Sequence, residues 1–105
     1  MLAAAGALLY FSIDKPSPDT SQGLYPFTSE RMLTDKDLKG MSTDELKMMR
    51  NEIFARHGYI FNDPKLNAYF KAQSWYKPTN DINSVQLNAV ESYNANFIKE
   101  YEQKQ

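Results

Sequence analysis

The sequence contains no cysteine and only one histidine among its 105 residues. Without cysteine there can be no disulfide, no thiolate metal ligand and no cysteine nucleophile. A single histidine also excludes zinc sites that take two or three histidines from one chain. We therefore expect neither a metal ion nor a cofactor.

The chain also lacks a surplus of charge of either sign. Twelve Lys and Arg residues stand against thirteen Asp and Glu residues, which gives a formal net charge of −1. Nucleic-acid binding needs an excess of basic residues on one face, because they must neutralise phosphates. We therefore expect no nucleic-acid partner. Glycine and proline are few, 4 and 5 residues, which excludes collagen-like and low-complexity architectures.

Three segments of different composition divide the chain. Residues 1–13 are almost continuously apolar. This run is shorter than the about 18–20 residues of a membrane span, and no basic residue precedes it as in a complete signal peptide. We expect part of a signal or membrane anchor, with a helix packed on the domain as the alternative. Residues 14–23 are rich in Pro, Ser and Thr and predict a linker, and residues 24–105 predict one domain.

Capping signals predict that this domain is all-α, a small bundle of about four helices. Ser42 and Glu45 form a capping box, in which each side chain bonds the backbone N–H of the other. No stretch alternates apolar and polar residues as a strand would, so we expect no sheet. A loop with Trp75 and Tyr76 is expected to close the core. The predicted helices run from Thr34 through Leu38 with a stop at Gly40, from Ser42 to His57 before Gly58, from Asn62–Pro64 past Phe70, and from Asn83 to about Gln103.

Polar side chains interrupt the apolar stripes of two predicted helices. Burying an unpaired polar group costs roughly 1–3 kcal/mol. We therefore expect Arg50, Asn51, His57 and Asn94 to form a structural polar cluster, bonded to one another or to the backbone. The predicted stripes are Leu46, Met49, Ile53 and Phe54 in the second helix and Leu87, Val90, Tyr93, Phe97 and Tyr101 in the last.

The same part of the sequence also suggests a binding site. Arg50, Glu52, Arg56 and His57 would form a small pocket for an anionic or sugar ligand, since Arg suits carboxylate and phosphate groups. An acid–base pair of Glu52 and His57 is disfavoured, because residues five apart do not share a side of a helix.

Trp75 and Tyr76 allow two interpretations. Both rings can pack in the core of this small domain, where large aromatics must supply much of the buried area. Alternatively, they offer a flat apolar surface on which a sugar ring can stack. The sequence leaves both interpretations open.

Residues 50–58, RNEIFARHG, resemble the signature of the YARHG domain family, a small module of bacterial extracytoplasmic proteins. The five residues that give the family its name are FARHG here, with Phe54 where tyrosine is usual. The lost phenol hydroxyl favours a packing role for this ring. Flanking residues are similar too: Tyr25-Pro26, Leu33-Thr34, Asp37-Leu38, Leu66, Tyr69-Phe70, Trp75-Tyr76 and Pro78. The resemblance implies an extracytoplasmic location and a suggested association with the cell wall, and it supplies no catalytic residues.

Together these observations predict a non-catalytic, secreted or membrane-anchored module that binds a component of the bacterial cell envelope. The partner would be a cell-wall glycan or an envelope protein, and contact with the membrane would come only from the N-terminal segment. The alternative is a structural or accessory domain of a larger envelope protein. A hydrolase is the third possibility, but no two carboxylates are placed as a catalytic pair.

Overall fold

The computed structural model describes residues 22–105, and within this range the chain is all-α, with four α-helices and no strand. The predicted fold class is therefore confirmed. No helix in this range is long and apolar enough to cross a membrane. The apolar segment 1–13 and the linker up to residue 21 lie outside the described residues.

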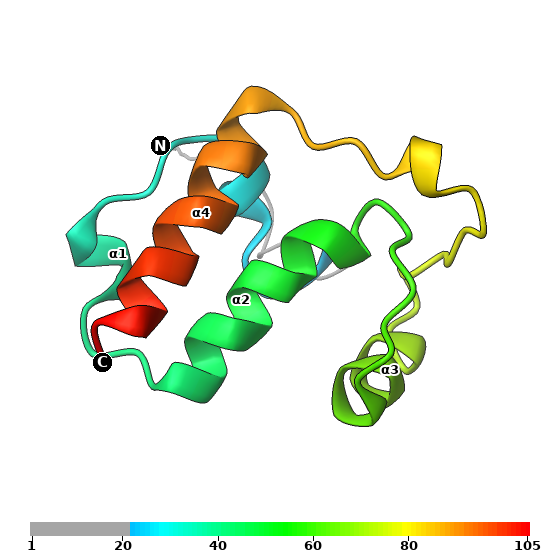
Figure 1. The fold of residues 1–105 in the computed structure, drawn as a ribbon, viewed down its shortest axis with the longest axis horizontal. Coiled ribbons are helices and arrows are strands. Elements are labelled where there is room, and N and C mark those ends of the chain that lie inside the picture. Colours follow the sequence, from blue (N-terminus) through cyan, green and yellow to red (C-terminus); the bar gives the residue numbers. More distant parts are fainter. Residues whose placement is uncertain (1–21) are drawn as a thin grey trace, which may run out of the picture.

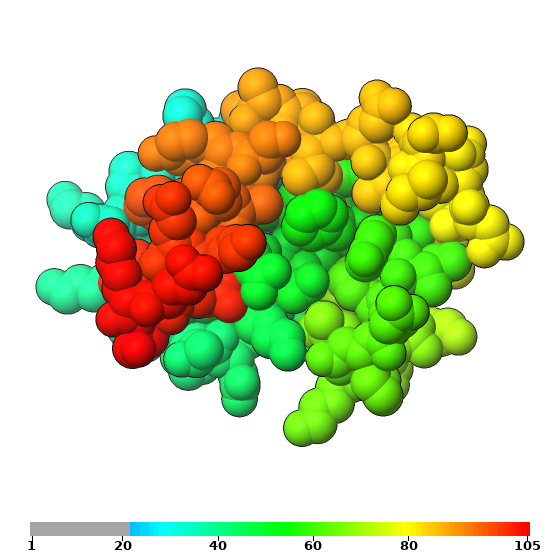
Figure 2. All heavy atoms as spheres, in the orientation of Figure 1, coloured from blue at the N-terminus to red at the C-terminus, as the bar shows by residue number. Residues whose placement is uncertain are grey.

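Helices α2 and α4 lie side by side at the centre of the fold, and α3 stands at the far end of α2 (Figure 1). A long connection leads from α3 back to α4, and side chains fill the space between the ribbons (Figure 2). The elements are η2 (Pro26–Ser29), α1 (Asp35–Leu38), α2 (Thr43–Ala55), α3 (Pro64–Lys71), η3 (Ile82–Ser84) and α4 (Ala89–Gln103).

Three of the four α-helices begin at the capping residue that the sequence predicts. The Ser42 hydroxyl accepts from the Glu45 N–H at 3.1 Å, and the Glu45 carboxylate accepts from the Ser42 N–H at 2.8 Å. At α3 the Asp63 carboxylate accepts from the N–H groups of Lys65 and Leu66. Such bonds satisfy N–H groups that have no partner inside a helix. The confirmed starts are those of α1, α2 and α3.

Helix α2 ends two residues earlier than predicted, but Gly58 is its stop. The Gly58 N–H donates to the Ala55 carbonyl at 2.9 Å, and the Tyr59 N–H donates to the Phe54 carbonyl at 3.2 Å. This pattern requires a left-handed residue, and Gly58 has φ +86°. A Cβ there would also lie 2.6 Å from the Lys77 carbonyl oxygen. Both the backbone conformation and the lack of space therefore disfavour a side chain at this position.

The start predicted for the last helix at Asn83 is wrong. Helix α4 begins after Asn88, whose side chain accepts from the Glu91 N–H at 2.8 Å, while the Glu91 carboxylate accepts from the Asn88 N–H at 2.9 Å. Residues 82–84 form the short η3 instead. The competing box would have used Gln86. A carboxylate is the stronger acceptor and also suits the positive end of the helix dipole.

Two hydrophobic cores share α2. One lies between α1, α2 and α4, and the other lies between the end of α2, α3 and the loop that follows α3. Phe70 is fully buried in the second core, where its ring stacks on Phe61 at 4.9 Å. The loop carrying Trp75 and Tyr76 therefore closes this core, as predicted. The buried residues are Leu33, Leu38, Leu46, Met49, Ile53, Ala95 and Ile98 in the first core and Ala55, Phe61, Leu66, Phe70 and Tyr76 in the second.

The face that α4 turns toward α2 differs from the predicted apolar stripe. Tyr93, expected to point inward, is 42% exposed. The face centres instead on two polar residues, Glu91 and Asn94, which an apolar pattern cannot reveal. Leu87, Phe97 and Tyr101 pack at its edge. The buried residues of α4 are Glu91, Asn94, Ala95 and Ile98.

Asn94 fixes the segment between η2 and α1 onto α4. Its side chain is fully buried. Its Oδ1 accepts from the Leu33 N–H at 2.8 Å, and its Nδ2 donates to the carbonyls of Thr28 at 2.9 Å and Arg31 at 2.8 Å. The expectation that Asn94 bonds to the backbone is confirmed.

We predict that Asn94→Ala lowers the free energy of unfolding by about 3 kcal/mol, because it leaves buried backbone groups of three residues without partners. Urea unfolding followed by circular dichroism measures this loss. Asn96→Ala, at an exposed position of the same helix, is the control and should change stability little. Equal midpoints for the two variants would contradict the prediction.

Candidate functional site

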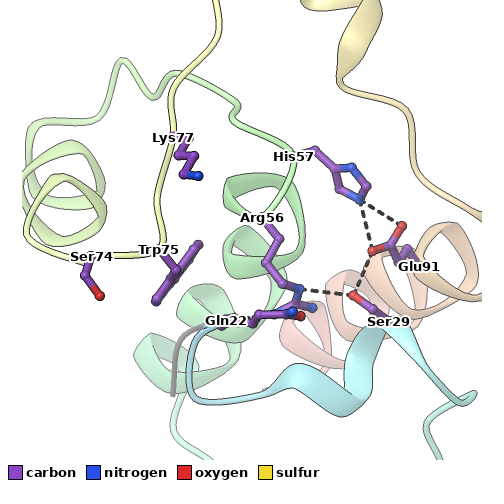
Figure 3. A pocket seen from close by; sticks show the side chains of 8 residues that line it. All are labelled: Gln22, Ser29, Arg56, His57, Ser74, Trp75, Lys77 and Glu91. Carbon is purple, nitrogen blue, oxygen red and sulfur yellow. Dashed lines mark hydrogen bonds and ion pairs between the residues drawn. The ribbon is translucent and has the colours of Figure 1, made fainter. Parts of the chain in front are cut away.

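A cleft of about 620 Å³ lies between the loop after α3 and the ends of α2, η2 and α4. Figure 3 shows the two sides: the loop contributes three side chains, and the other elements face them across the opening. The loop side consists of Ser74, Trp75 and Lys77, and the facing side of Gln22, Ser29, Arg56, His57 and Glu91.

A buried carboxylate lies behind the facing side of the cleft. Glu52 is fully buried. Its oxygens accept from the backbone N–H groups of Leu24 and Tyr25, each at 2.8 Å, and from Arg56 Nη1 at 2.7 Å. Glu52 and Arg56 are four residues apart, so they are neighbours on the surface of a helix. Their contact is present, but the pair is inside the protein because the chain before η2 covers it.

Most of the N–H groups of Arg56 form hydrogen bonds inside the protein. Besides Glu52, its guanidinium donates to Ser29 Oγ at 3.0 Å, to the Gln22 carbonyl at 3.2 Å and to the Thr28 hydroxyl. A guanidinium has five N–H groups, and these bonds leave one of them uncommitted within residues 22–105. Arg56 therefore holds the start of the domain and η2 against α2.

Glu91 receives hydrogen bonds from three sides. His57 Nε2 lies 3.0 Å from both carboxylate oxygens, Ser29 Oγ donates at 2.7 Å, and the Asn88 N–H donates at 2.9 Å. Burial by itself would raise the pKa of Glu91, but the bonds from Asn88, Ser29 and His57 outweigh burial, so the pKa lies below its ordinary value. The carboxylate is therefore ionised at neutral pH, and its acceptor sites are occupied.

The hydrogen bonds around Ser29 and Glu91 hold these side chains in place and do not form a catalytic arrangement. Nucleophilic catalysis by Ser29 would need a base in contact with its hydroxyl, but that hydroxyl donates to Glu91, whose lowered pKa makes it a weak base. Arg56 donates to the same oxygen. Across residues 22–105 no three His, Asp or Glu side chains gather as a metal site requires.

The four residues expected to form one polar cluster lie apart. Arg50 pairs with Glu102, with Nε 2.5 Å from Oε2, and Asn51 donates to a carbonyl of its own helix. Arg50 and His57 share a helical stripe, but seven residues span about 10 Å along the axis. Since α4 runs antiparallel to α2, they meet opposite ends of α4. Arg50 therefore lies outside the cleft that contains His57.

Trp75 and Tyr76 differ in their surroundings, although the sequence allowed either core packing or sugar stacking for both. Tyr76 is 8% exposed, and its hydroxyl donates to the Tyr59 carbonyl at 2.6 Å, so this ring belongs to the core. Trp75 is half-buried, packs edge-to-face against Phe70 with ring centres 6.0 Å apart, and also lines the cleft. Its Nε1 is buried and has no partner among the described residues.

Glu91, Ser29, Ser74 and Lys77 line the cleft but were not expected from the sequence. The signal for Glu91 was its place three residues after Asn88, which marks the true capping box. The other three carry no local signal, because they reach the cleft through contacts between distant segments.

A sequence model of the YARHG domain matches residues 21–103, which include every residue that lines the cleft. Searches of curated proteins and of solved structures found no match.

We predict that Gly23→Ala destabilises the domain far more than Gly40→Ala. Both glycines have positive φ, +109° and +84°, so each alanine bears a backbone cost of about 1–2 kcal/mol. A Cβ at Gly23 would also overlap the Glu52 carboxylate, whereas nothing lies within 4 Å at Gly40. Disturbing a buried ion pair adds about 3–5 kcal/mol. Urea unfolding of the two variants tests the difference, and equal losses would contradict it.

We also predict that Glu91→Gln lowers stability at neutral pH but not in acid. The lowered pKa of Glu91 means that its contribution is complete above its ordinary value of 4.5 and is lost as pH falls through the lowered pKa. The expected loss at pH 7 is roughly 1.5–3 kcal/mol, the value of hydrogen bonds to a charged group. Unfolding curves across the acid range measure it, with exposed Glu100→Gln as the control. A loss that stays constant with pH would contradict this assignment.

Proposed function

The chain belongs to the YARHG domain family, and we propose that it is a non-catalytic module on the outside of a bacterial cell whose cleft binds a cell-wall glycan. The observation that carries this proposal is the position of Trp75. Its ring lines one side of the cleft, and polar side chains line the other (Figure 3).

This combination suits a saccharide. An aromatic face offers the flat apolar surface on which the C–H face of a sugar ring packs. Hydroxyl groups need donors and acceptors nearby, and small-molecule sites place a few such groups in an otherwise closed cleft. The Ser74 hydroxyl, the Lys77 ammonium and His57 Nδ1 line the cleft and have no hydrogen-bond partner within residues 22–105, so we assign these groups to contact with the sugar.

The state of Glu91 supports binding without catalysis. Glycoside hydrolysis requires one carboxyl group that gives up a proton and a second that acts as base or nucleophile. Glu91 is held ionised by its hydrogen bonds, and Glu52, the other acid beside the cleft, is buried behind Arg56. Neither carboxylate is free to serve a bound sugar.

The location outside the cytoplasm is supported by the order of segments in the sequence. An apolar run at residues 1–13 and a Pro/Ser-rich linker precede the domain, as in tethered modules. We propose that contact with the membrane is limited to residues 1–13. Gln22, near the end of this linker, lines the cleft.

A structural or accessory role is the second candidate, and the Arg56 contacts favour it. Four hydrogen-bond partners from three segments hold this guanidinium, which is 7% exposed. Such a closed network stabilises the domain without a ligand. On this alternative, changes on the surface of the cleft would leave every interaction of the protein unchanged.

We predict that Ser74→Tyr weakens co-sedimentation of the 105-residue chain with purified bacterial sacculi by about tenfold, equal to about 1.4 kcal/mol. Ser74 is exposed and lines the cleft, so the added ring fills the opening without entering a core. Ser92→Tyr adds the same ring at an exposed position of α4 outside the cleft and is the matched control. Truncating Trp75 is less suitable, because its ring also packs on Phe70.

The outcomes separate the two candidates. Loss of sedimentation in the Ser74 variant alone supports glycan binding in the cleft. Equal binding by both variants and the wild type would remove the cleft from the interaction. A wild type that stays in solution with sacculi would contradict glycan binding and leave the accessory role.

A further inference from the structure

The charged groups of the cleft leave one cation without a counterion. The two carboxylates each face a basic side chain: Glu52 pairs with Arg56 at 2.7 Å, and Glu91 pairs with His57 at 3.0 Å. Lys77 has no acidic partner anywhere in residues 22–105. Lys77 is therefore the cation lining the cleft that no carboxylate of the described residues contacts.

The backbone that carries Lys77 is held in place beside the cleft. The Thr79 N–H donates to the Gly58 carbonyl at 2.8 Å, and the Lys77 carbonyl packs where Gly58 has no side chain. The end of α2 thus positions the segment two residues beyond Trp75. In Figure 3 the ammonium of Lys77 points from this segment into the space that Arg56 and His57 face.

The usual local reasons for a lysine do not apply to Lys77. Lysines in the last turn of a helix interact with the negative end of the helix dipole, as Lys71 does in α3. Lys77 lies outside every helix. Lys47, by contrast, has a carboxylate 3.4 Å away. Lys77 is therefore a cation that the fold presents to the cleft without using it.

We infer that the saccharide bound in the cleft is acidic, with its ring on Trp75 and a carboxylate at Lys77. This inference rests on the proposed function and adds the chemical class of the ligand. A carboxylate on the ligand would give Lys77 the acidic partner that it lacks among residues 22–105 and would receive a charge-assisted hydrogen bond, which is stronger than a neutral one. In a cell wall such a carboxylate belongs either to the sugar itself or to a peptide attached to the glycan.

The test compares Lys77→Gln with Lys99→Gln, which removes the same charge from an exposed position of α4. Each variant and the wild type are titrated against native sacculi and against sacculi whose carboxyl groups have been converted to methylamides. We expect amidation to weaken wild type and Lys99→Gln about tenfold, a typical loss for one charge-assisted contact. Lys77→Gln should bind native sacculi equally weakly and should not respond to amidation.

A third arm identifies the source of the carboxylate. Peptide-free glycan strands compete with native sacculi for the wild type if the carboxylate lies on the sugar, and fail to compete if it lies on the peptide. Either result agrees with the inference when Lys77→Gln alone is insensitive to amidation. Wild-type binding that is equal before and after amidation, or a Lys77→Gln variant that binds like Lys99→Gln, would overturn it while leaving a neutral glycan site. Absence of wild-type binding to every probe would instead overturn the proposed function.

Discussion

The buried carboxylate of Glu52 is the interaction on which the rest of this domain depends. Removing a carboxylate from water is costly unless hydrogen bonds and a cation replace the lost solvent. Two backbone N–H groups and the Arg56 guanidinium do so here. Because those N–H groups belong to Leu24 and Tyr25, the start of the domain is fixed against α2. Because Arg56 is fixed in the same bond, it can in turn hold η2 and form a rigid side of the cleft.

Two contacts with carboxylates extend this constraint to α4. His57 meets Glu91 near the start of α4, and Arg50 meets Glu102 near its end, so the two antiparallel helices are held in register at both ends. Ser29 joins this arrangement to the first, since its hydroxyl accepts from Arg56 and donates to Glu91. The facing side of the cleft is thus one connected network of hydrogen bonds, built from three elements that are distant in the sequence.

The sequence predicts the parts of the fold that depend on near neighbours. The caps of α2 and α3 and the glycine stop at Gly58 involve residues at most five apart, and the structure confirms them. The inward face of α4 could not be predicted in this way, because Asn94 is buried through bonds to backbone groups more than sixty residues away. The burial of Glu52 has the same origin. A charge on the flank of a helix looks exposed until the segment that covers it is known.

The residues FARHG at positions 54–58 act as a scaffold for the cleft. Phe54 packs against both cores, Arg56 and His57 are bound to carboxylates, and Gly58 allows the close approach of the segment after α3. Side chains engaged in this way have little capacity left for a ligand. If the cleft binds a glycan as we propose, contact with it would fall mainly on the opposite side, which Trp75 and Lys77 line. On this proposal a signature that builds one side of the cleft would be compatible with different ligands, because Ser74, Trp75 and Lys77 on the other side lie outside the signature.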